Sequence, residues 1–179
     1  MVEEIKTARL TLRKFNSDDL KPFNAWSRNP AVTKFLKWPP HMGITISKLA
    51  LDSWIDAYND PSFYNWAIVL NEANEAIGSI TVVNQNEKKK SMEIGFCIAE
   101  ERWGNGYTTE ALKAVIAYLF THTRVNRIEC KHDPNNTRCK GVLLKSGLTY
   151  EGTLREASFN NTGVCDLSYY SILRREFEK

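Results

Sequence analysis

Two glycines, Gly104 and Gly106, stand one residue apart in the segment ERWGNGYTTEAL, residues 101–112. An apolar run that predicts a strand precedes them, and a segment that predicts a helix follows. Glycine weakens a helix or strand interior by roughly 0.5–1 kcal/mol relative to alanine, so this pair indicates positive φ angles or a ligand close to the main chain. A helix N-terminus also offers unpaired N–H groups and a partial positive charge. The pattern therefore favours a phosphate-bearing ligand, with a plain glycine turn as the alternative.

Two common phosphate-binding motifs do not fit this turn. A P-loop requires Lys-Ser or Lys-Thr after the glycines, and the dinucleotide fingerprint requires a third glycine, whereas the run reads GNGYTT. The sequence therefore indicates neither a nucleoside triphosphatase nor a dehydrogenase.

The elements around the turn predict an α+β fold. Helices are expected over residues 17–28, with Ser17 as the N-cap, and over residues 46–58, 106–122 and 135–146. Strands are expected over residues 9–15, 64–70, 75–84, 92–99, 127–132, 153–159 and 166–173. The strand–turn–helix–strand unit from 92 to 132 should be parallel and right-handed, inside a sheet that is otherwise mostly antiparallel. We expect residues 1–179 to form a single domain, since their number and their 42% hydrophobic content suit one core.

Charge and composition exclude several classes of protein. The net charge of +3 comes from 24 basic and 21 acidic side chains that are interspersed, which argues against a nucleic-acid partner. The longest apolar run, residues 114–120, is far shorter than the ~20 residues of a membrane span. The cysteines and histidines lack metal-ligand spacing, and residues 1–10 show no secretory pattern, so we expect a metal-free protein in the cytoplasm.

Three segments together resemble the GNAT superfamily of acetyl-CoA-dependent N-acetyltransferases, and most closely its Rim-type branch, which acetylates ribosomal-protein N-termini. They are RLTLRKFNSDDL (residues 9–20), MEIGFCIAEERWGNGYTTEAL (92–112) and RIECKHDPNNTRCKGVLLKSGLTYEG (127–152). The resemblance implies a GNAT-like sheet in which the parallel strands 92–99 and 127–132 splay apart, flanked by helices. It also implies acetyl-CoA as co-substrate and an amine as acceptor.

The resemblance implies where acetyl-CoA binds. The family's Q/R-x-x-G-x-G/A turn binds the pyrophosphate, and here Glu101 occupies the first position, with Arg102 next. The pantetheine arm should lie along the earlier splayed strand like an added strand. The residues expected to bind the cofactor are Phe96, Cys97, Ile98, Arg102, Trp103, Gly104, Asn105, Gly106, Tyr107, Thr108 and Asn136.

Acetyl transfer to an amine requires a base for the amine and an acid for the departing thiolate. Glu93, on the early strand, is the candidate base; the alternative is an ordinary carboxylate on a polar strand face. Cys139 lies three residues after Asn136, where the resembling branch has a serine in N-x-x-S. Its thiol is either the acid or part of the core.

The acceptor should bind beside the loop KWPPHMG, residues 37–43, with Trp38 as the candidate contact. The branch resemblance implies a protein N-terminal α-amine; a small amine is the rival acceptor, and a non-catalytic CoA sensor the rival function. The loop carries Lys37 and His41 and no acid, which argues against a polyamine.

Overall fold

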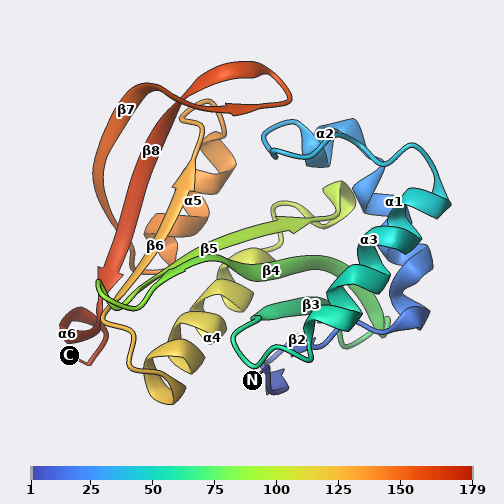
Figure 1. The fold of residues 1–179 in the computed structure, drawn as a ribbon, viewed down its shortest axis with the longest axis horizontal. Helices are drawn as coiled ribbons and strands as arrows, with labels where there is room; N and C mark the ends of the chain where they lie inside the picture. Colours follow the sequence, from blue (N-terminus) through green and yellow to red (C-terminus); the bar gives the residue numbers. More distant parts are fainter. Residues whose placement is uncertain (1, 179) are drawn as a thin grey trace.

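An eight-stranded sheet runs through the computed structural model, which describes residues 2–178 (Figure 1). Its strand order is β1-β2-β3-β4-β5-β6-β8-β7, and only β5 and β6 are parallel neighbours. The mixed, mostly antiparallel sheet is thus confirmed. The strands are β1 (Ile5–Lys6), β2 (Leu10–Arg13), β3 (Asn65–Leu70), β4 (Glu75–Asn86), β5 (Ser91–Ile98), β6 (Arg127–His132), β7 (Thr149–Asn160) and β8 (Gly163–Leu173).

The parallel strands β5 and β6 are joined only where they begin. Their register runs from Ser91 opposite Arg127 to Glu93 opposite Glu129. After that point β5 continues along β4 as far as Ile98, whereas β6 continues along β8, so the two strands diverge (Figure 1). The later half of β5 therefore has an edge that β6 does not pair, and the expected splay is confirmed.

Helix α4 (Tyr107–His122) packs on one face of the sheet (Figure 1). Its residues Leu112, Val115, Ile116 and Leu119 recur at helical spacing, and all four are buried in the core on this face. Full burial of such a side chain contributes roughly 1.5–3 kcal/mol. This stripe therefore fixes the position of α4, and with it the glycine turn at its N-terminus.

Helices α1 (Leu20–Ser27) and α3 (Ile44–Ala57) form a second core on the opposite face. Phe23 packs against Trp26 and Trp54, with ring centroids 4.8 and 5.0 Å apart. The indole of Trp26 donates a hydrogen bond to the Ala76 carbonyl oxygen. These aromatic residues, from the first third of the chain, therefore form part of the hydrophobic core.

The first helix begins one residue earlier than the sequence indicates. Ser17 is the expected N-cap, but Asn16 caps the short 3₁₀ helix η1 (Ser17–Asp19) that leads into α1. The backbone of Asn16 is extended, so its side-chain oxygen reaches the Asp18 N–H, while Asp19 accepts from the Asn16 N–H. This reciprocal capping box explains the shift.

Asn29 and Pro30 end α1, as expected, but they also start a helix that the sequence analysis misses, α2 (Pro30–Thr33). The Asn29 side chain accepts from the Ala31 N–H, and proline at the first helical position sacrifices no hydrogen bond. The remaining helices are η2 (Glu100–Arg102), α5 (Thr137–Lys145) and α6 (Arg174–Phe177). None of the helices within residues 2–178 is long and apolar enough to cross a membrane.

Candidate active site

A cavity of about 1050 Å³ lies beside the diverging half of β5. Its walls come from the end of β5, the glycine turn, the start of α4, one side of α5 along its whole length and residues 31–36 around α2. Most of the residues selected from the sequence meet here: Phe96, Cys97, Ile98, Arg102, Trp103, Gly104, Gly106, Tyr107, Thr108, Asn136 and Cys139. Asn105, Glu93 and Trp38 are not part of the lining.

The glycine turn has the backbone that the sequence predicts. Gly104 and Gly106 have φ angles of 79° and 80°, in the left-handed region that side chains disfavour. Gly106 is the N-cap of α4, and no side chain caps that helix end. The Asn105 amide donates to the carbonyl oxygens of Arg102 and Trp103, which ties the turn together. The bare helix N-terminus therefore faces the cavity and favours an anion there.

Arg102 adds a positive charge to the wall of the cavity. One of its terminal nitrogens lies 3.0 Å from the Glu75 carboxylate. Its Nε is buried and has no hydrogen-bond partner among the described residues. An orphaned donor of this kind is costly unless a ligand oxygen accepts from it. Glu101, in the position where the family has Gln or Arg, is exposed and does not line the cavity.

Three further basic residues line the cavity where α4 and α5 face each other: Lys113, Arg138 and Lys145. The guanidinium of Arg138 lies 4.6 Å from the centre of the Trp103 ring, which holds it against the turn. This end of the cavity therefore suits a second anionic group.

Arg9, which the sequence analysis misses, bonds to the backbone of the glycine turn and helps to hold it in place. Its guanidinium donates to the Asn105 carbonyl oxygen at 2.9 Å and pairs with Glu110. It also lies 4.5 Å from the centre of the Tyr107 ring. Burial alone would raise the pKa of Glu110, but hydrogen bonds from Thr7 and Arg9 lower it overall, so this carboxylate stays ionised as the partner of Arg9.

Asn136 is the N-cap of α5, and its side-chain oxygen accepts from the Cys139 N–H at 3.3 Å. Cys139 lines the cavity and also packs against the core beneath α4. Burial raises the pKa of the Cys139 thiol to about 12, so the thiol is protonated at neutral pH. This position tests neither of the roles considered for Cys139, proton donor and core residue, because the raised pKa keeps the proton on the sulfur but also makes the thiol a weaker acid.

Cys97 lines the cavity from β5, with its sulfur 3.4 Å from the Ser79 hydroxyl. Burial raises the pKa of its thiol to about 11. A protonated thiol in this position contributes an uncharged, weakly polar surface to the cavity.

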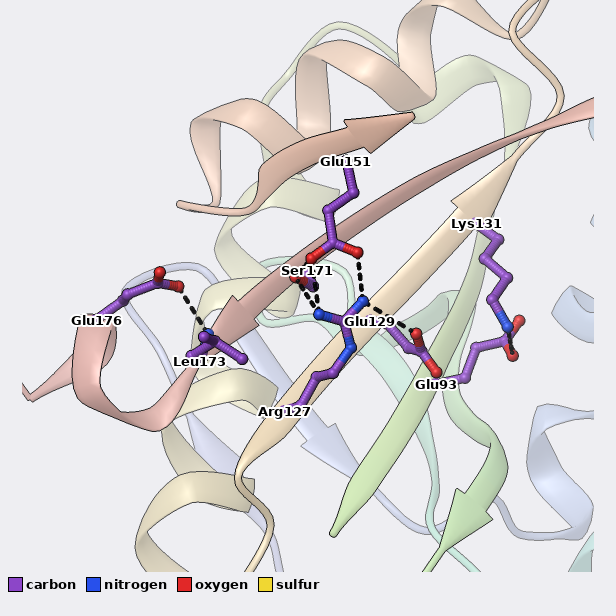
Figure 2. Close-up of polar contacts among 8 residues, drawn as sticks. All are labelled: Glu93, Arg127, Glu129, Lys131, Glu151, Ser171, Leu173 and Glu176. Atoms are coloured by element: carbon purple, nitrogen blue, oxygen red, sulfur yellow. Dashed lines mark hydrogen bonds and ion pairs between the residues drawn. The ribbon is translucent and has the colours of Figure 1, made fainter. Parts of the chain in front are cut away.

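Glu93 lies at the other end of β5, where the strands are still paired. Figure 2 shows Lys131 reaching from β6 to its carboxylate, and the nitrogen and oxygen are 2.7 Å apart. Arg127, on the same face of β6, pairs with Glu151 and donates to Ser171. Glu93 thus forms one ion pair, with Lys131, near the separate group around Arg127, and its role as a base remains a prediction.

Trp38 packs at a tilt against His41, with ring centroids 5.2 Å apart, in the loop that follows α2. The residues just before it, Lys34, Phe35 and Leu36, line the cavity instead. Residues 34–36, at the start of this loop, therefore form the cavity wall, and the Trp38 indole does not.

No cluster of three or more potential metal ligands occurs within residues 2–178.

Comparison with known proteins identifies related sequences. The family model described as "Acetyltransferase (GNAT) domain" matches residues 9–149. The N-acetyltransferase p20 of Bacillus licheniformis, described as uncharacterized, is 28% identical over 98% of this chain and 99% of its own length. The putative ribosomal N-acetyltransferase YdaF of Bacillus subtilis (strain 168) is 34% identical over 56% of this chain and 55% of its own.

Solved structures share the fold at low identity. A GNAT-family acetyltransferase from Bacillus anthracis superposes with a TM-score of 0.86 at 24% identity, covering 97% of this chain and 99% of that one. RimL, the ribosomal L7/L12 alpha-N-protein acetyltransferase, in complex with coenzyme A, gives a TM-score of 0.85 at 19% identity, covering 96% and 98% of the two chains.

Proposed function

Because the GNAT domain model matches residues 9–149, this chain belongs to the GNAT acetyltransferase family, and from that premise we propose that its acceptor is the α-amine of a protein N-terminus. As a member of the family it is an N-acetyltransferase that uses acetyl-CoA. The identity of the acceptor and the roles of individual residues are what the proposal adds.

We assign the pyrophosphate of acetyl-CoA to the glycine turn. The uncapped N-terminus of α4, the left-handed Gly106 and the unpartnered Nε of Arg102 support this assignment. The 3′-phosphate is assigned to the basic group of Lys113, Arg138 and Lys145. Both assignments place a negative charge beside a fixed positive one.

The acetyl thioester is assigned to the end of β5. Its unpaired edge can bond the amides of the pantetheine arm, and an N–H near Phe96 or Cys97 can stabilise the oxyanion. The amine nitrogen attacks the carbonyl carbon, and the C–S bond breaks as the intermediate collapses. The amine proton passes through water to Glu93, which lies outside the cavity lining toward the start of β5, and Cys139 protonates the departing thiolate.

The ion pair of Glu93 is the observation that carries the choice of acceptor. The Glu93 carboxylate is engaged by Lys131 and lies outside the cavity lining, which limits its access to the acceptor, so an amine that is already partly neutral is favoured. With a pKa of about 7.7–8.0, an α-amine is about a third neutral at pH 7.5. A lysine-like amine with a pKa of about 10.4 is neutral to only about 0.1%.

The charges near α2 also oppose a polyamine. Lys34 lines the cavity, and Lys37 lies 5.8 Å from the centre of the Phe159 ring on the facing hairpin. Glu100 also lines the cavity, and its carboxylate accepts from the Asn29 side chain. The relatives described as ribosomal and alpha-N-protein acetyltransferases support a protein N-terminus as acceptor.

A thiol-release assay with acetyl-CoA tests this proposal. Its panel contains a serine-initiated hexapeptide with a free α-amine and no lysine, the same peptide with a blocked α-amine and one lysine, spermidine, and free amino acids. We expect the first peptide to have the highest kcat/KM, with mass spectrometry placing the acetyl group on its α-amine. A higher kcat/KM for spermidine or a free amino acid would identify a small-amine acetyltransferase instead.

A further inference from the structure

Two neighbouring asparagines, the last residue of β7 and the first residue of the turn to β8, bond to two segments that flank the cavity. The side-chain amide of Asn160 donates to the Asp133 carboxylate at 2.9 Å, in the loop that leads into α5. The amide of Asn161 donates to the carbonyl oxygens of Thr33, Leu36 and Trp38, at 2.9, 3.2 and 2.8 Å. We call these links the asparagine bridge.

The bridge joins parts of the chain that are far apart in sequence. Figure 1 shows the tip of the β7–β8 hairpin extending over the sheet toward α2. Asn161 is 128 residues from Thr33, and no local sequence pattern connects them. Lys37 and Phe159 add a weaker contact between the same two segments. The hairpin tip therefore spans the space between α5 and α2.

The α2 segment, residues 30–38, has little regular structure to hold its shape. Helix α2 contains four residues, and the carbonyl groups at and beyond its end lack intrahelical partners. The Asn161 amide nitrogen, which has two N–H donors, lies within hydrogen-bond distance of the carbonyl oxygens of Thr33, Leu36 and Trp38, and the Thr33 oxygen also accepts from the Leu36 N–H. This same segment supplies Lys34, Phe35 and Leu36 to the cavity wall.

We infer that Asn161 is a positioning residue for the acceptor. By fixing the carbonyl groups of the α2 segment, it sets the wall against which the acceptor amine is aligned with the thioester. The groups assigned to the phosphates of acetyl-CoA lie on α4, α5 and the glycine turn, and Asn161 bonds to none of them. The inference rests on the N-acetyltransferase reaction of the proposed function, but not on the acceptor being a protein N-terminus.

Steady-state kinetics of Asn161→Ala tests the inference. With the serine-initiated hexapeptide, or the best amine of the panel if that peptide is not acetylated, we expect acceptor KM to rise at least tenfold. The KM for acetyl-CoA should stay within twofold. Asn161→Gln keeps the amide and should recover part of the loss, whereas Asn161→Asp, which places a carboxylate against three carbonyl oxygens, should recover none. Val164→Ala, at a side chain 72% exposed on the same hairpin, is the matched control and should behave like wild type.

Hydrogen exchange provides a readout that needs no acceptor. Backbone amides of residues 33–38 should exchange faster in Asn161→Ala than in wild type, while those of α4 keep their rates. Unchanged exchange in residues 33–38, or an unchanged acceptor KM, would overturn the inference. Equal rises in both KM values, or a loss in kcat alone, would also overturn it. If the peptide is not acetylated in the acceptor panel, only the assignment of the acceptor fails. Hydrogen exchange, and kinetics measured with the best amine of the panel, still test the role of Asn161.

Discussion

Cys139 holds a protonated thiol at the cavity wall, and its burial raises its pKa to about 12. If it protonates the departing CoA thiolate, Cys139→Ala should lower kcat and leave CoA affinity nearly unchanged, and Cys139→Ser should keep much of the activity. General-acid catalysis typically accelerates a reaction by about 10²–10⁴-fold. Steady-state kinetics, combined with calorimetry of CoA binding, can therefore distinguish a catalytic role of Cys139 from a packing role. A loss below about tenfold in Cys139→Ala would assign the thiol to the core.

Glu93 is the second residue whose chemical role can be tested directly. Glu93→Gln keeps the shape of the side chain and removes the base and its ion pair with Lys131. We expect the loss in kcat/KM to be largest at low pH, where the acceptor amine is most protonated, and to shrink as the pH approaches the pKa of the amine. A pH–rate profile measures this. A loss independent of pH would make Glu93 a positioning residue, and an unchanged rate would leave it with a structural role.

The sequence predicts those site residues whose signal comes from adjacent residues in the chain. It does not predict the residues that reach the site from distant parts of the chain. Gly104, Gly106 and Asn136 carry local signals, because turn and cap chemistry depends on adjacent residues. Arg9 and Asn161 carry none, since their partners Asn105 and Thr33 lie 96 and 128 residues away. Only the fold brings such pairs together.

The strand–turn–helix element makes its own prediction. Replacing Gly106 by valine strains a φ of 80° and places a β-branched side chain at the uncapped N-terminus of α4. CoA affinity measured by calorimetry should fall at least tenfold, because the anion site loses both its shape and its access. Gly43→Val is the matched control: Gly43 is also a helix N-cap with positive φ, but it does not line the cavity. Similar losses of CoA affinity in the two variants would mean that backbone strain, and not blocked access of the phosphate, causes the loss.

Long periodic elements are predictable and short ones are not. The apolar stripe of α4 spans several turns and identifies both the helix and its buried face. Helix α2 and strand β1 have four and two residues, too few for a period to emerge. Most residues of β7 are exposed, so the alternation that marks a half-buried strand is absent from much of its length.

At the scale of the whole molecule, one buried and one half-buried histidine predict that the folded state loses stability in mild acid. Burial lowers the pKa of His132, whose Nε2 is buried with no hydrogen-bond partner in the described part of the chain and whose ring stacks 5.3 Å from that of Tyr170. Burial lowers the pKa of His41 as well. The unfolded state then binds protons at a higher pH than the folded state, so stability should fall as the pH drops below about 6.5.

Urea unfolding followed by tryptophan fluorescence at pH 7.5, 6.0 and 5.0 checks this prediction. His132→Phe keeps an aromatic ring beside Tyr170 and removes the titrating group, so its loss of stability over this range should be smaller than in wild type. An identical loss would contradict the assignment to His132. A further decline is expected below pH 4.5, because the hydrogen bond from Arg127 lowers the pKa of Glu151 to about 2, and protonating Glu151 removes that stabilisation.

The order of strands in the sheet also bears on how the chain reaches its native state. From β1 to β6 the spatial order follows the chain, and only β7 and β8 are exchanged. The β3–β4–β5 meander and the β7–β8 hairpin therefore close short loops, whereas Leu10 must find Leu70 and Asn161 must find Thr33. Since closing longer loops costs more entropy, we expect the meander and hairpin to form first during refolding and the asparagine bridge last. Pulsed hydrogen exchange would contradict this order if amides of β2 became protected before those of β4.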